Sequence, residues 1–314
     1  MNKKVAILIG VVVLVIALAA VLIFGVDWEY SVGICYKTDT DADNQVFRET
    51  LEKALSDRQI RLITYSAQGD PALQIQQVRQ LAEQDCAVVL VEPVSAITPM
   101  ELTDLLVTLE LPAVVTGAQA DGTQSHELIT YLGVDPAQAG TVQAQMAQTL
   151  PDGGDINGDG VISYVVIQGP EDHMDARQRT GALEYALSSG DLRGNRLVLK
   201  QGSWTEESGK QLCLEALAEF GIDIEVIFCG SDLLTQGAAA AVAESGWAAG
   251  RDFYLFGMGT QAETRQLLED GIVSGTVDYN LAAYVQYLDL LILNKLKDEQ
   301  LPQQPNLLCT AVLP

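Results

Sequence analysis

Short, continuous apolar runs alternate along the chain with longer stretches in which apolar residues recur every third or fourth position. The short runs predict strands that are buried on both faces, and the longer stretches predict amphipathic helices between them. The expected strands are 31–36, 61–65, 87–91, 112–116, 128–132, 164–167, 196–200, 225–229, 253–256 and 273–277. The expected helices are 44–55, 71–83, 98–109, 136–150, 175–187, 206–220, 233–245, 261–269 and 281–296.

The alternation of strands and helices predicts an α/β protein with open, doubly wound parallel sheets. The series restarts after residue 163, which divides the 314 residues into two similar lobes joined by a hinge. We expect 28–133 and 280–298 in the first lobe, and 134–279 and 299–314 in the second. Ligands of such sheets bind at the carboxyl ends of the strands. The loops at those ends are 37–43, 92–94, 116–119, 169–179, 230–232, 257–261 and 278–280.

The N-terminus carries a targeting signal. Lys3 and Lys4 precede an uncharged apolar run over 5–26, which is long enough to cross a bilayer as a helix. The positive-inside rule places everything after residue 27 outside the cytoplasm. The exit of the run is a poor cleavage site, so we predict that 1–27 is an uncleaved signal anchor. A cleaved signal sequence is the alternative.

Charge and cysteine content narrow the choice of partners. The net charge is −24, from 18 basic and 42 acidic residues, which disfavours nucleic acid and anionic lipid as partners. Five cysteines leave at least one thiol unpaired in an exported protein. Several lie in or beside apolar runs, so we interpret them as free thiols packed in the core.

A metal-binding pattern precedes the second series of strands. Oxygen-bearing side chains occupy alternate positions from Asp155 to Ser163, and Gly160 occupies the sixth, where such a loop turns sharply. The twelfth position, which in an EF-hand loop is a bidentate Glu, is Val166. The loop also leads into a strand and not into a helix. Either the site is incomplete, or a carboxylate from elsewhere completes it; a solvated turn is the alternative without metal.

Four stretches together resemble a known family. They are Tyr36-Lys37-Thr38-Asp39, the loop DINGDGVIS, the segment 169–180 with its pattern G…H-x-D-A-x-x-R-T, and Ile224-Glu225-Val226 followed by Ser231-Asp232 and Gly237-Ala238. Over residues 31–314 the chain resembles periplasmic sugar-binding proteins of the type I fold, most closely the calcium-containing galactose/glucose-binding members. The resemblance implies two lobes that close on a small ligand.

The resemblance also implies how the metal loop is completed. In the family a distant Glu just before a later strand supplies the bidentate carboxylate, and the matching residue is Glu225. A structural Ca²⁺ is then expected, with Asp155, Asn157, Asp159, the Val161 carbonyl, Ser163 and Glu225 as its ligands. Ser163 departs from the longer Gln of the family, which weakens the site or leaves room for a water.

The sugar contacts implied by the resemblance are His173, Asp175, Arg179, Trp204, Asp41, Ser231 and Asp278. A carboxylate accepts hydrogen bonds from vicinal hydroxyls, a guanidinium donates in a fixed fork, and an aromatic ring stacks on the apolar face of a sugar. Several have an alternative: His173 could be a hydrogen-bonded loop histidine, Asp175 could cap a helix, Arg179 could pair with an acid, and Trp204 could pack in the core or at its rim. Asp39 or Asp43 could replace Asp41.

Several contact positions, that of Ser231 among them, hold a different residue from the family's. Where the family has Asn, this chain has Gly117, Ser231 and Tyr279, and where the family has an Asp it has Gly259. These losses remove much of the hydrogen bonding that fixes a hexose, so we do not expect the ligand to be simply galactose or glucose.

The resemblance predicts a monomeric, non-enzymatic, extracytoplasmic solute-binding protein for a carbohydrate or related small polar ligand. It would serve an ABC permease in sugar transport or, through the membrane anchor, a sensor such as a histidine kinase. One alternative is a degenerate binding lobe used for protein contact. A cleft hydrolase is less favoured, because the chain has no Gly-x-Ser-x-Gly or Walker pattern and only two histidines.

Overall fold

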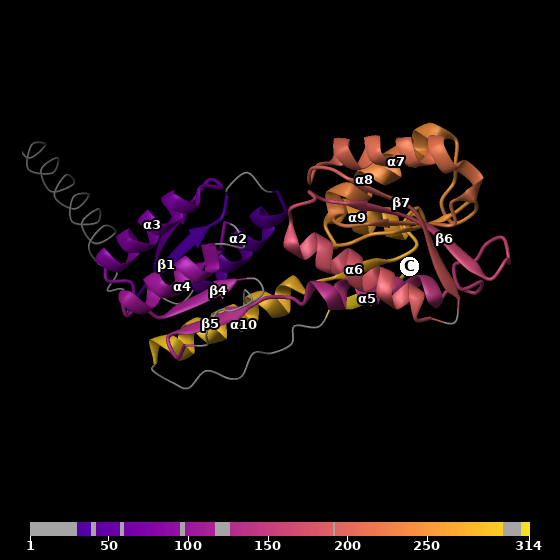
Figure 1. The fold of residues 1–314 in the computed structure, drawn as a ribbon. Helices are drawn as coiled ribbons and strands as arrows, with labels where there is room; N and C mark the ends of the chain where they lie inside the picture. The colour runs from indigo at the N-terminus through magenta and orange to yellow at the C-terminus, as the bar shows by residue number, and fades with distance from the viewer. Residues whose placement is uncertain are drawn as a thin grey trace, which may run out of the picture. The chain divides into compact units, whose positions relative to one another are not determined.

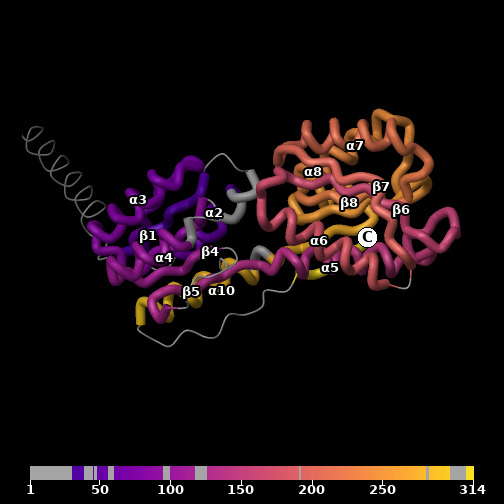
Figure 2. Tube along the Cα trace, viewed as in Figure 1, coloured from indigo at the N-terminus to yellow at the C-terminus, as the bar shows by residue number. Residues whose placement is uncertain are grey.

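The computed structural model describes residues 30–38, 42–56, 60–94, 98–116, 126–190, 192–297 and 309–314. These residues form two compact units. The first contains the described residues up to Tyr131 and those from Tyr287 to the end of the last helix. The second contains Leu132–Gln286 and the C-terminal residues. Figures 1 and 2 show each unit as a sheet with helices packed against it.

The first unit is a five-stranded sheet with the strand order β2-β1-β3-β4-β5. Its strands are β1 (Tyr30–Tyr36), β2 (Ile60–Ser66), β3 (Val88–Val91), β4 (Ala113–Thr116) and β5 (Ile129–Leu132). Its helices are α2 (Ala42–Ser56), α3 (Pro71–Glu83), α4 (Thr98–Thr108) and most of α10 (Leu281–Leu296). β1 pairs in parallel with both β2 and β3, and all four residues of β3 are buried, as the apolar run predicts.

The second unit is built around a four-stranded parallel sheet with the order β7-β6-β8-β9. Its strands are β6 (Val161–Gln168), β7 (Arg193–Gln201), β8 (Val226–Cys229) and β9 (Tyr254–Phe256). Its helices are α5 (Pro136–Gln148), α6 (Met174–Ser188), α7 (Glu206–Phe220), α8 (Asp232–Ser245) and α9 (Ala262–Glu269), with a short 3₁₀ turn at Gly221–Asp223.

Helices cover both faces of this sheet. Figure 1 shows α7 and α8 on one face and α5 and α6 on the other. Two glycines allow each pair to pack closely: a Cβ on Gly237 of α8 would lie 2.0 Å from the Glu206 carbonyl oxygen, and one on Gly140 of α5 would lie 2.0 Å from the Arg179 carbonyl oxygen. The core is therefore two apolar layers, one on each face of the sheet.

The strand orders define where a ligand would bind. In each unit the second strand along the chain lies on one side of the first, and the third strand lies on its other side. The order therefore reverses between β1 and β3 and between β6 and β8. Ligands of open α/β sheets bind outside the carboxyl ends of the strands at such switch points. The strands that flank the switch point end at Tyr36 and Val91 in the first unit, and at Gln168 and Cys229 in the second.

The parallel α/β fold predicted from the sequence is confirmed, with one difference near the end of the chain. The strand expected over 273–277 is β10 (Thr276–Asp278), and it pairs antiparallel with β11 (Thr310–Val312) in a separate two-stranded sheet. Val273 is buried in the apolar core instead. The antiparallel partner is too short and too distant along the chain for a local pattern to predict the pairing.

The predicted anchor at 1–27 lies outside the described residues. Among the residues that the structure describes, none of the helices combines the length and the apolar composition that a membrane span requires. All five cysteines are buried free thiols, in agreement with the interpretation from the sequence. Burial raises the pKa of the Cys35 thiol to about 12 and that of Cys213 to about 12, so both stay protonated and packed at neutral pH.

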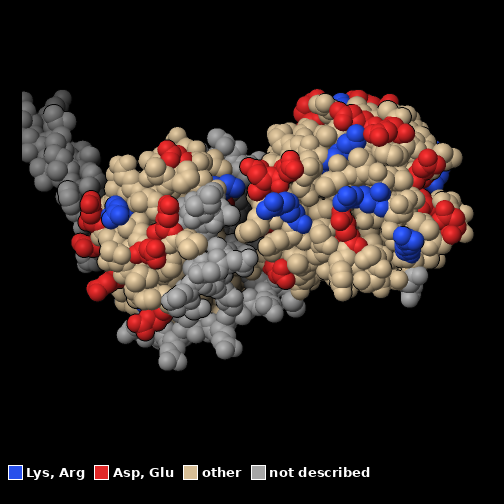
Figure 3. Space-filling model, in the orientation of Figure 1, with Lys and Arg blue, Asp and Glu red and all other residues tan. Residues whose placement is uncertain are grey.

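Acidic side chains do not form one continuous patch on the face shown in Figure 3. Asp and Glu lie there in separate small groups over both units, with Lys and Arg between them on the second unit. The second unit contains ion pairs, among them Lys200 with Glu219 at 3.1 Å and Lys210 with Glu244 at 2.7 Å. Exposed pairs of this kind contribute little to stability.

A buried glutamine ties the strand ends of the second unit together. The side-chain nitrogen of Gln143, on α5, donates to the carbonyl oxygens of Cys229 at 2.9 Å, Phe256 at 3.4 Å and Gly257 at 2.9 Å. These carbonyls end β8 and β9, whose following loops carry candidate binding residues. One amide therefore fixes the spacing of two neighbouring loops.

We predict that Gln143→Leu lowers the free energy of unfolding by about 1–3 kcal/mol, because buried carbonyl oxygens lose their donor. Chemical denaturation of the variant and the wild type measures the difference. Gln211→Leu is the control, since Gln211 is exposed on α7 and its side chain bonds, among the described residues, to Glu215 alone, at 3.1 Å. A Gln143→Leu variant as stable as the control would contradict the role of the amide.

Candidate functional site

The predicted ligand residues of the second unit lie on four different elements at the carboxyl ends of its strands. His173, Asp175 and Arg179 lie on or just before α6, which follows β6. Trp204 follows β7, Ser231 follows β8, and Asp278 ends β10. Residues more than 100 positions apart are thus placed at one edge of the fold, where ligands of α/β sheets bind.

Trp204 is the centre of a cluster at this edge. The guanidinium carbon of Arg179 lies 5.9 Å from the centre of the Trp204 ring, in the range of a cation–π contact. The His173 ring meets the same ring edge-on, with a centroid distance of 5.4 Å. The structure therefore brings together three of the seven predicted contacts. Trp204 also packs against the apolar core and is only partly exposed, as its alternative expects, and its stacking on a sugar stays a prediction.

A glycine makes room for the Trp204 ring. A Cβ on Gly169 would lie 2.2 Å from two carbon atoms of the ring, far inside van der Waals contact. Gly169 directly follows Gln168, the last residue of β6. The indole can lie over the end of this strand only because position 169 has no side chain.

Arg179 has a second partner that sequence reasoning did not identify. Its Nη1 donates a hydrogen bond to the hydroxyl oxygen of Tyr279, which follows β10. Burial raises the pKa of the Tyr279 hydroxyl, and the nearby Arg179 charge lowers it in part. The phenol therefore stays neutral at physiological pH. The expected alternative for Arg179, an ion pair with an acid on its own helix, is not formed among the described residues.

Asp232 is a buried carboxylate at the start of α8. It is 8% exposed, and its Oδ1 accepts from the backbone nitrogen of Gln261 at 3.0 Å. Burial is the main cause that raises its pKa to about 6; hydrogen bonds from Thr264 and Gln261 and the charge of Arg265 oppose the rise. A Cβ on Gly259 would lie 1.8 Å from Oδ2 of this carboxylate. The carboxylate thus occupies the space that a side chain at position 259 would need.

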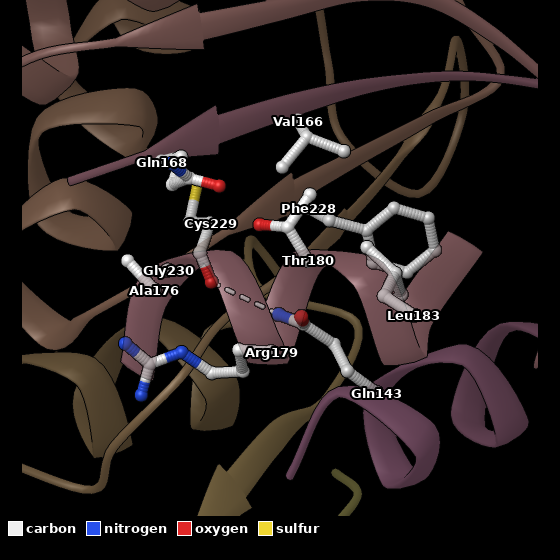
Figure 4. Close-up of a pocket in the computed structure, with 10 residues that line it drawn as sticks. All are labelled: Gln143, Val166, Gln168, Ala176, Arg179, Thr180, Leu183, Phe228, Cys229 and Gly230. Atoms are coloured by element: carbon white, nitrogen blue, oxygen red, sulfur yellow. Dashed lines mark hydrogen bonds between the residues drawn. The ribbon is translucent and has the colours of Figure 1, made fainter. Parts of the chain in front are cut away.

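A small pocket lies between α6 and the ends of β6 and β8. Its lining residues are Gln143, Val166, Gln168, Ala176, Arg179, Thr180, Leu183, Phe228, Cys229 and Gly230. Figure 4 shows the Gln143 amide reaching the Cys229 carbonyl, while the Arg179 guanidinium extends away from it. The side-chain nitrogen of Gln168, a residue 2% exposed, has no hydrogen-bond partner among the described residues. Gln168 is a second residue that sequence reasoning missed.

The other predicted contacts of this unit have structural partners. The Ser231 hydroxyl oxygen caps α8 by accepting from the Leu234 nitrogen at 3.2 Å. Oδ1 of Asp278 accepts from Thr260 Oγ1 at 3.2 Å and from the Asn280 nitrogen at 2.8 Å. Asp175 lies in the first turn of α6, whose N-cap residue is His173 without a side-chain capping bond. Their contacts with a ligand stay predictions.

The ligand residues predicted in the first unit cannot be placed. Asp39 and Asp41, and the side chain of Asp43, lie outside the described residues, as does Gly117. At the described switch point, Oε2 of Glu92 accepts from the backbone nitrogen of Lys37 at 3.2 Å, joining the ends of β3 and β1. Glu92 is therefore the described carboxylate at the position where a ligand of this sheet would bind.

The predicted metal loop is folded around its own carboxylate. Asp155, 8% exposed, accepts from the backbone nitrogens of Gly158 at 2.8 Å, Asp159 at 3.0 Å and Gly160 at 2.8 Å. Gly160 has φ = +87°, which is the left-handed turn expected at the sixth position. The loop then leads directly into β6, as predicted.

Glu225 reaches this loop across the fold. Glu225 is 2% exposed. Its Oε1 accepts from the Asn157 nitrogen at 3.0 Å and its Oε2 from the Ser163 nitrogen at 2.7 Å. Burial raises its pKa, the two backbone bonds oppose the rise, and the charges of Asp155 and Asp159 add to it. Each carboxylate oxygen keeps a further lone pair for a cation.

The donor set fits a hard cation. Buried carboxylates that repel one another are ordinarily paired with a positive charge or a metal. Among the described residues, no three acidic, His or Cys side chains converge closely enough to hold a metal by themselves. A calcium site would also use the Asn157, Ser163 and Val161 oxygens, which belong to none of these side-chain types. The side chains of Ser163 and Asn195 are 3.5 Å apart, so the hydroxyl has a weak competing partner.

The fold and the site define a binding protein made of two α/β units, with its candidate ligand residues at the carboxyl ends of the strands. The sequence profile of the family described as the periplasmic binding protein domain matches residues 32–299. The chain belongs to this family, whose members are extracytoplasmic, and the resemblance described from the sequence is confirmed.

Individual relatives agree with this assignment. The chain is 28% identical to the D-galactose/methyl-galactoside binding periplasmic protein of Haemophilus influenzae over 286 residues, which is 88% of this chain and 83% of that protein. A Mycobacterium smegmatis protein in complex with β-D-fucofuranose has a TM-score of 0.77 at 20% identity, with 90% and 91% of the two chains covered. A Bacillus halodurans ABC transporter solute-binding protein with bound myo-inositol has a TM-score of 0.77 at 16% identity, with 91% and 95% covered. The two solved structures show the fold.

We predict that Gly169→Ala displaces the Trp204 ring, because the added Cβ would overlap it. The near-ultraviolet circular dichroism should change, and unfolding should cost about 1–3 kcal/mol less. Gly181→Ala on α6 is the control: no heavy atom lies within 4 Å of an added Cβ there, and the helix should gain up to about 1 kcal/mol. An unchanged spectrum and stability in Gly169→Ala would show that the ring does not lie over this glycine.

Proposed function

We propose that the protein is an extracytoplasmic receptor for a neutral carbohydrate or a related polyol. The observation that carries this proposal is the cluster of Trp204, His173 and Arg179 at the strand ends of the second unit. An indole face matches the apolar C–H face of a sugar ring, and a guanidinium donates to its hydroxyl oxygens. The relatives named above bind or hold galactosides, a fucofuranose and myo-inositol, which supports the same ligand class.

Charge favours a neutral ligand. Arg179 is accompanied at the strand ends by the carboxylates of Asp175, Asp232 and Asp278. Arg265 lies 3.8 Å from Asp278. The edge therefore offers both donors and acceptors, which suits hydroxyl groups that can do both, and it has no excess of positive charge for an anionic ligand.

The ligand differs from galactose and glucose in this proposal. Position 259 has no side chain to offer, and the Asp232 carboxylate fills the space beside it. Tyr279 binds Arg179 where the family has an Asn. The same scaffold is thus expected to accept a different arrangement of hydroxyl groups. The function is binding without catalysis, as for the relatives, which are binding proteins.

We also propose a structural Ca²⁺ held by Asp155, Asn157, Asp159, the Val161 carbonyl, Ser163 and Glu225. The support is the folded loop and the buried, mutually repelling carboxylates described above. The cation would tie the loop before β6 to the residue before β8. When bound, it would supply charge neutralisation and rigidity, not reactivity.

The partner in this proposal is an ABC permease that takes up the ligand, as expected for a solute-binding protein. A membrane sensor such as a histidine kinase is the alternative, because the predicted anchor at 1–27 would keep the protein at the membrane. We propose that the anchor is retained and that the protein is otherwise a monomer. Mass spectrometry of the native protein decides whether the segment is cleaved.

We predict that one or more members of a sugar panel raise the melting temperature of the full-length chain. The panel is D-galactose, D-glucose, L-arabinose, D-allose and myo-inositol, each at millimolar concentration in detergent solution with Ca²⁺. A ligand at about 100 times its Kd stabilises by about 2.7 kcal/mol, which is several degrees. Arg179→Gln should abolish the response. A calcium response without any sugar response would support the degenerate lobe used for protein contact.

We predict that Ca²⁺ raises the melting temperature relative to a chelator, by an amount corresponding to about 4 kcal/mol at 1,000 times the Kd. Glu225→Gln should remove most of this difference. Glu219→Gln is the matched control, because Glu219 is exposed on α7 and forms an ion pair with Lys200, far along the chain from the loop. Identical melting temperatures with calcium and with chelator in the wild type would refute the metal site.

A further inference from the structure

Tyr279 stands on a segment that is fixed on both sides. Before it, Asp278 Oδ1 accepts from Thr260 Oγ1 at 3.2 Å and from the Asn280 nitrogen at 2.8 Å. After it, Asn280 has φ = +50°, and its side chain accepts from the Ala283 nitrogen at 3.2 Å at the start of α10. These bonds leave the backbone at Tyr279 little freedom, so the direction of its side chain is set by the fold.

The Tyr279 side chain ends on Arg179. Arg179 Nη1 donates to the phenolic oxygen, and the guanidinium also lies over the Trp204 ring. Three elements far apart in the sequence thus meet at one guanidinium: α6, the loop after β7, and the segment after β10. A long arginine side chain has many rotamers, and a hydrogen bond at one end of the fork together with a ring against the planar group restricts them to few.

The partner leaves the charge of Arg179 available. Burial keeps the phenol neutral, as described above. In the part of the chain that the structure describes, no carboxylate forms an ion pair with Arg179. A guanidinium has five N–H donors, and Tyr279 takes one of them. The remaining donors and the full positive charge can still serve a ligand oxygen.

We propose that Tyr279 is a positioning residue for ligand binding: its hydroxyl oxygen holds the Arg179 guanidinium against Trp204 in the orientation that receives a hydroxyl-bearing ligand. The inference rests on the proposed function and adds to it a residue that contacts Arg179, which is itself expected to contact the ligand. Ordering a mobile side chain on binding weakens affinity, and a side chain ordered beforehand avoids that loss. Tyr279 orders the Arg179 side chain, the guanidinium of the Trp204 cluster, before the ligand binds.

The test is the substitution Tyr279→Phe, which removes one hydroxyl group and keeps the ring that packs against the core. Affinity is measured by calorimetric titration of the full-length chain with each panel sugar that binds the wild type. We expect about tenfold weaker binding, because an arginine side chain that is no longer held in place must be ordered when the ligand binds. The melting temperature without sugar should stay within about two degrees.

Two further variants separate positioning from general destabilisation. Tyr254→Phe removes a similar phenol that is not part of the Trp204 cluster. Its hydroxyl donates to Asp152 at 2.7 Å, and its loss should leave the affinity unchanged. In an Arg179→Lys background, which keeps the charge but not the fork, Tyr279→Phe should cost less than threefold, because its effect acts through the guanidinium. A full tenfold loss in that background overturns the proposal.

The failure of the inference is distinguishable from failure of the proposed function. If the wild type binds a panel sugar and Tyr279→Phe binds it equally well, the positioning role is refuted and the receptor function stands. If the wild type binds none of the five compounds, the proposed ligand class is refuted and the positioning role with it. A tenfold loss in Tyr279→Phe together with unchanged binding by Tyr254→Phe supports both.

Discussion

The burial of parallel strands on both faces is the constraint on which the rest of this structure depends. A strand with no polar face must be covered on both sides, so each parallel neighbour is reached through a helical crossover. All strands of a sheet then end at the same edge. In the second unit, Gly140 and Gly237 let the covering helices approach closely, and the edge beyond β6 and β8 is left for polar side chains. The candidate site is a consequence of this arrangement.

The two kinds of polar residue in the second unit are held in opposite ways. The carboxylates at the loop before β6 are satisfied by backbone nitrogens, which fix their positions but do not neutralise their charges. The residues of the Trp204 cluster are held mainly by side-chain contacts, with a ring, a guanidinium and a phenol supporting one another. The first arrangement suits a small cation. The second leaves donors for a larger, hydroxylated molecule.

Much of the fold could be predicted from the sequence because the signals are local. The helix Pro71–Glu83 has a proline at its start and Asp70 as its cap, and its predicted bounds agree with the structure. The loop from Asp155 and its completion by Glu225 required the resemblance, since no local pattern connects residues 155 and 225. The pairing of β10 with β11 could not be predicted, because three-residue strands carry no periodic signal.

The candidate site shows the same limit in a sharper form. Sequence comparison treats positions 259 and 279 as lost contacts, because each lacks the side chain that the family uses. The structure gives both substitutions a partner: Asp232 fills the space at Gly259, and Tyr279 binds Arg179. Both pairs join residues that are far apart along the chain, so neither can be read from a motif. What a motif counts as loss is, at these two positions, a different arrangement of polar side chains.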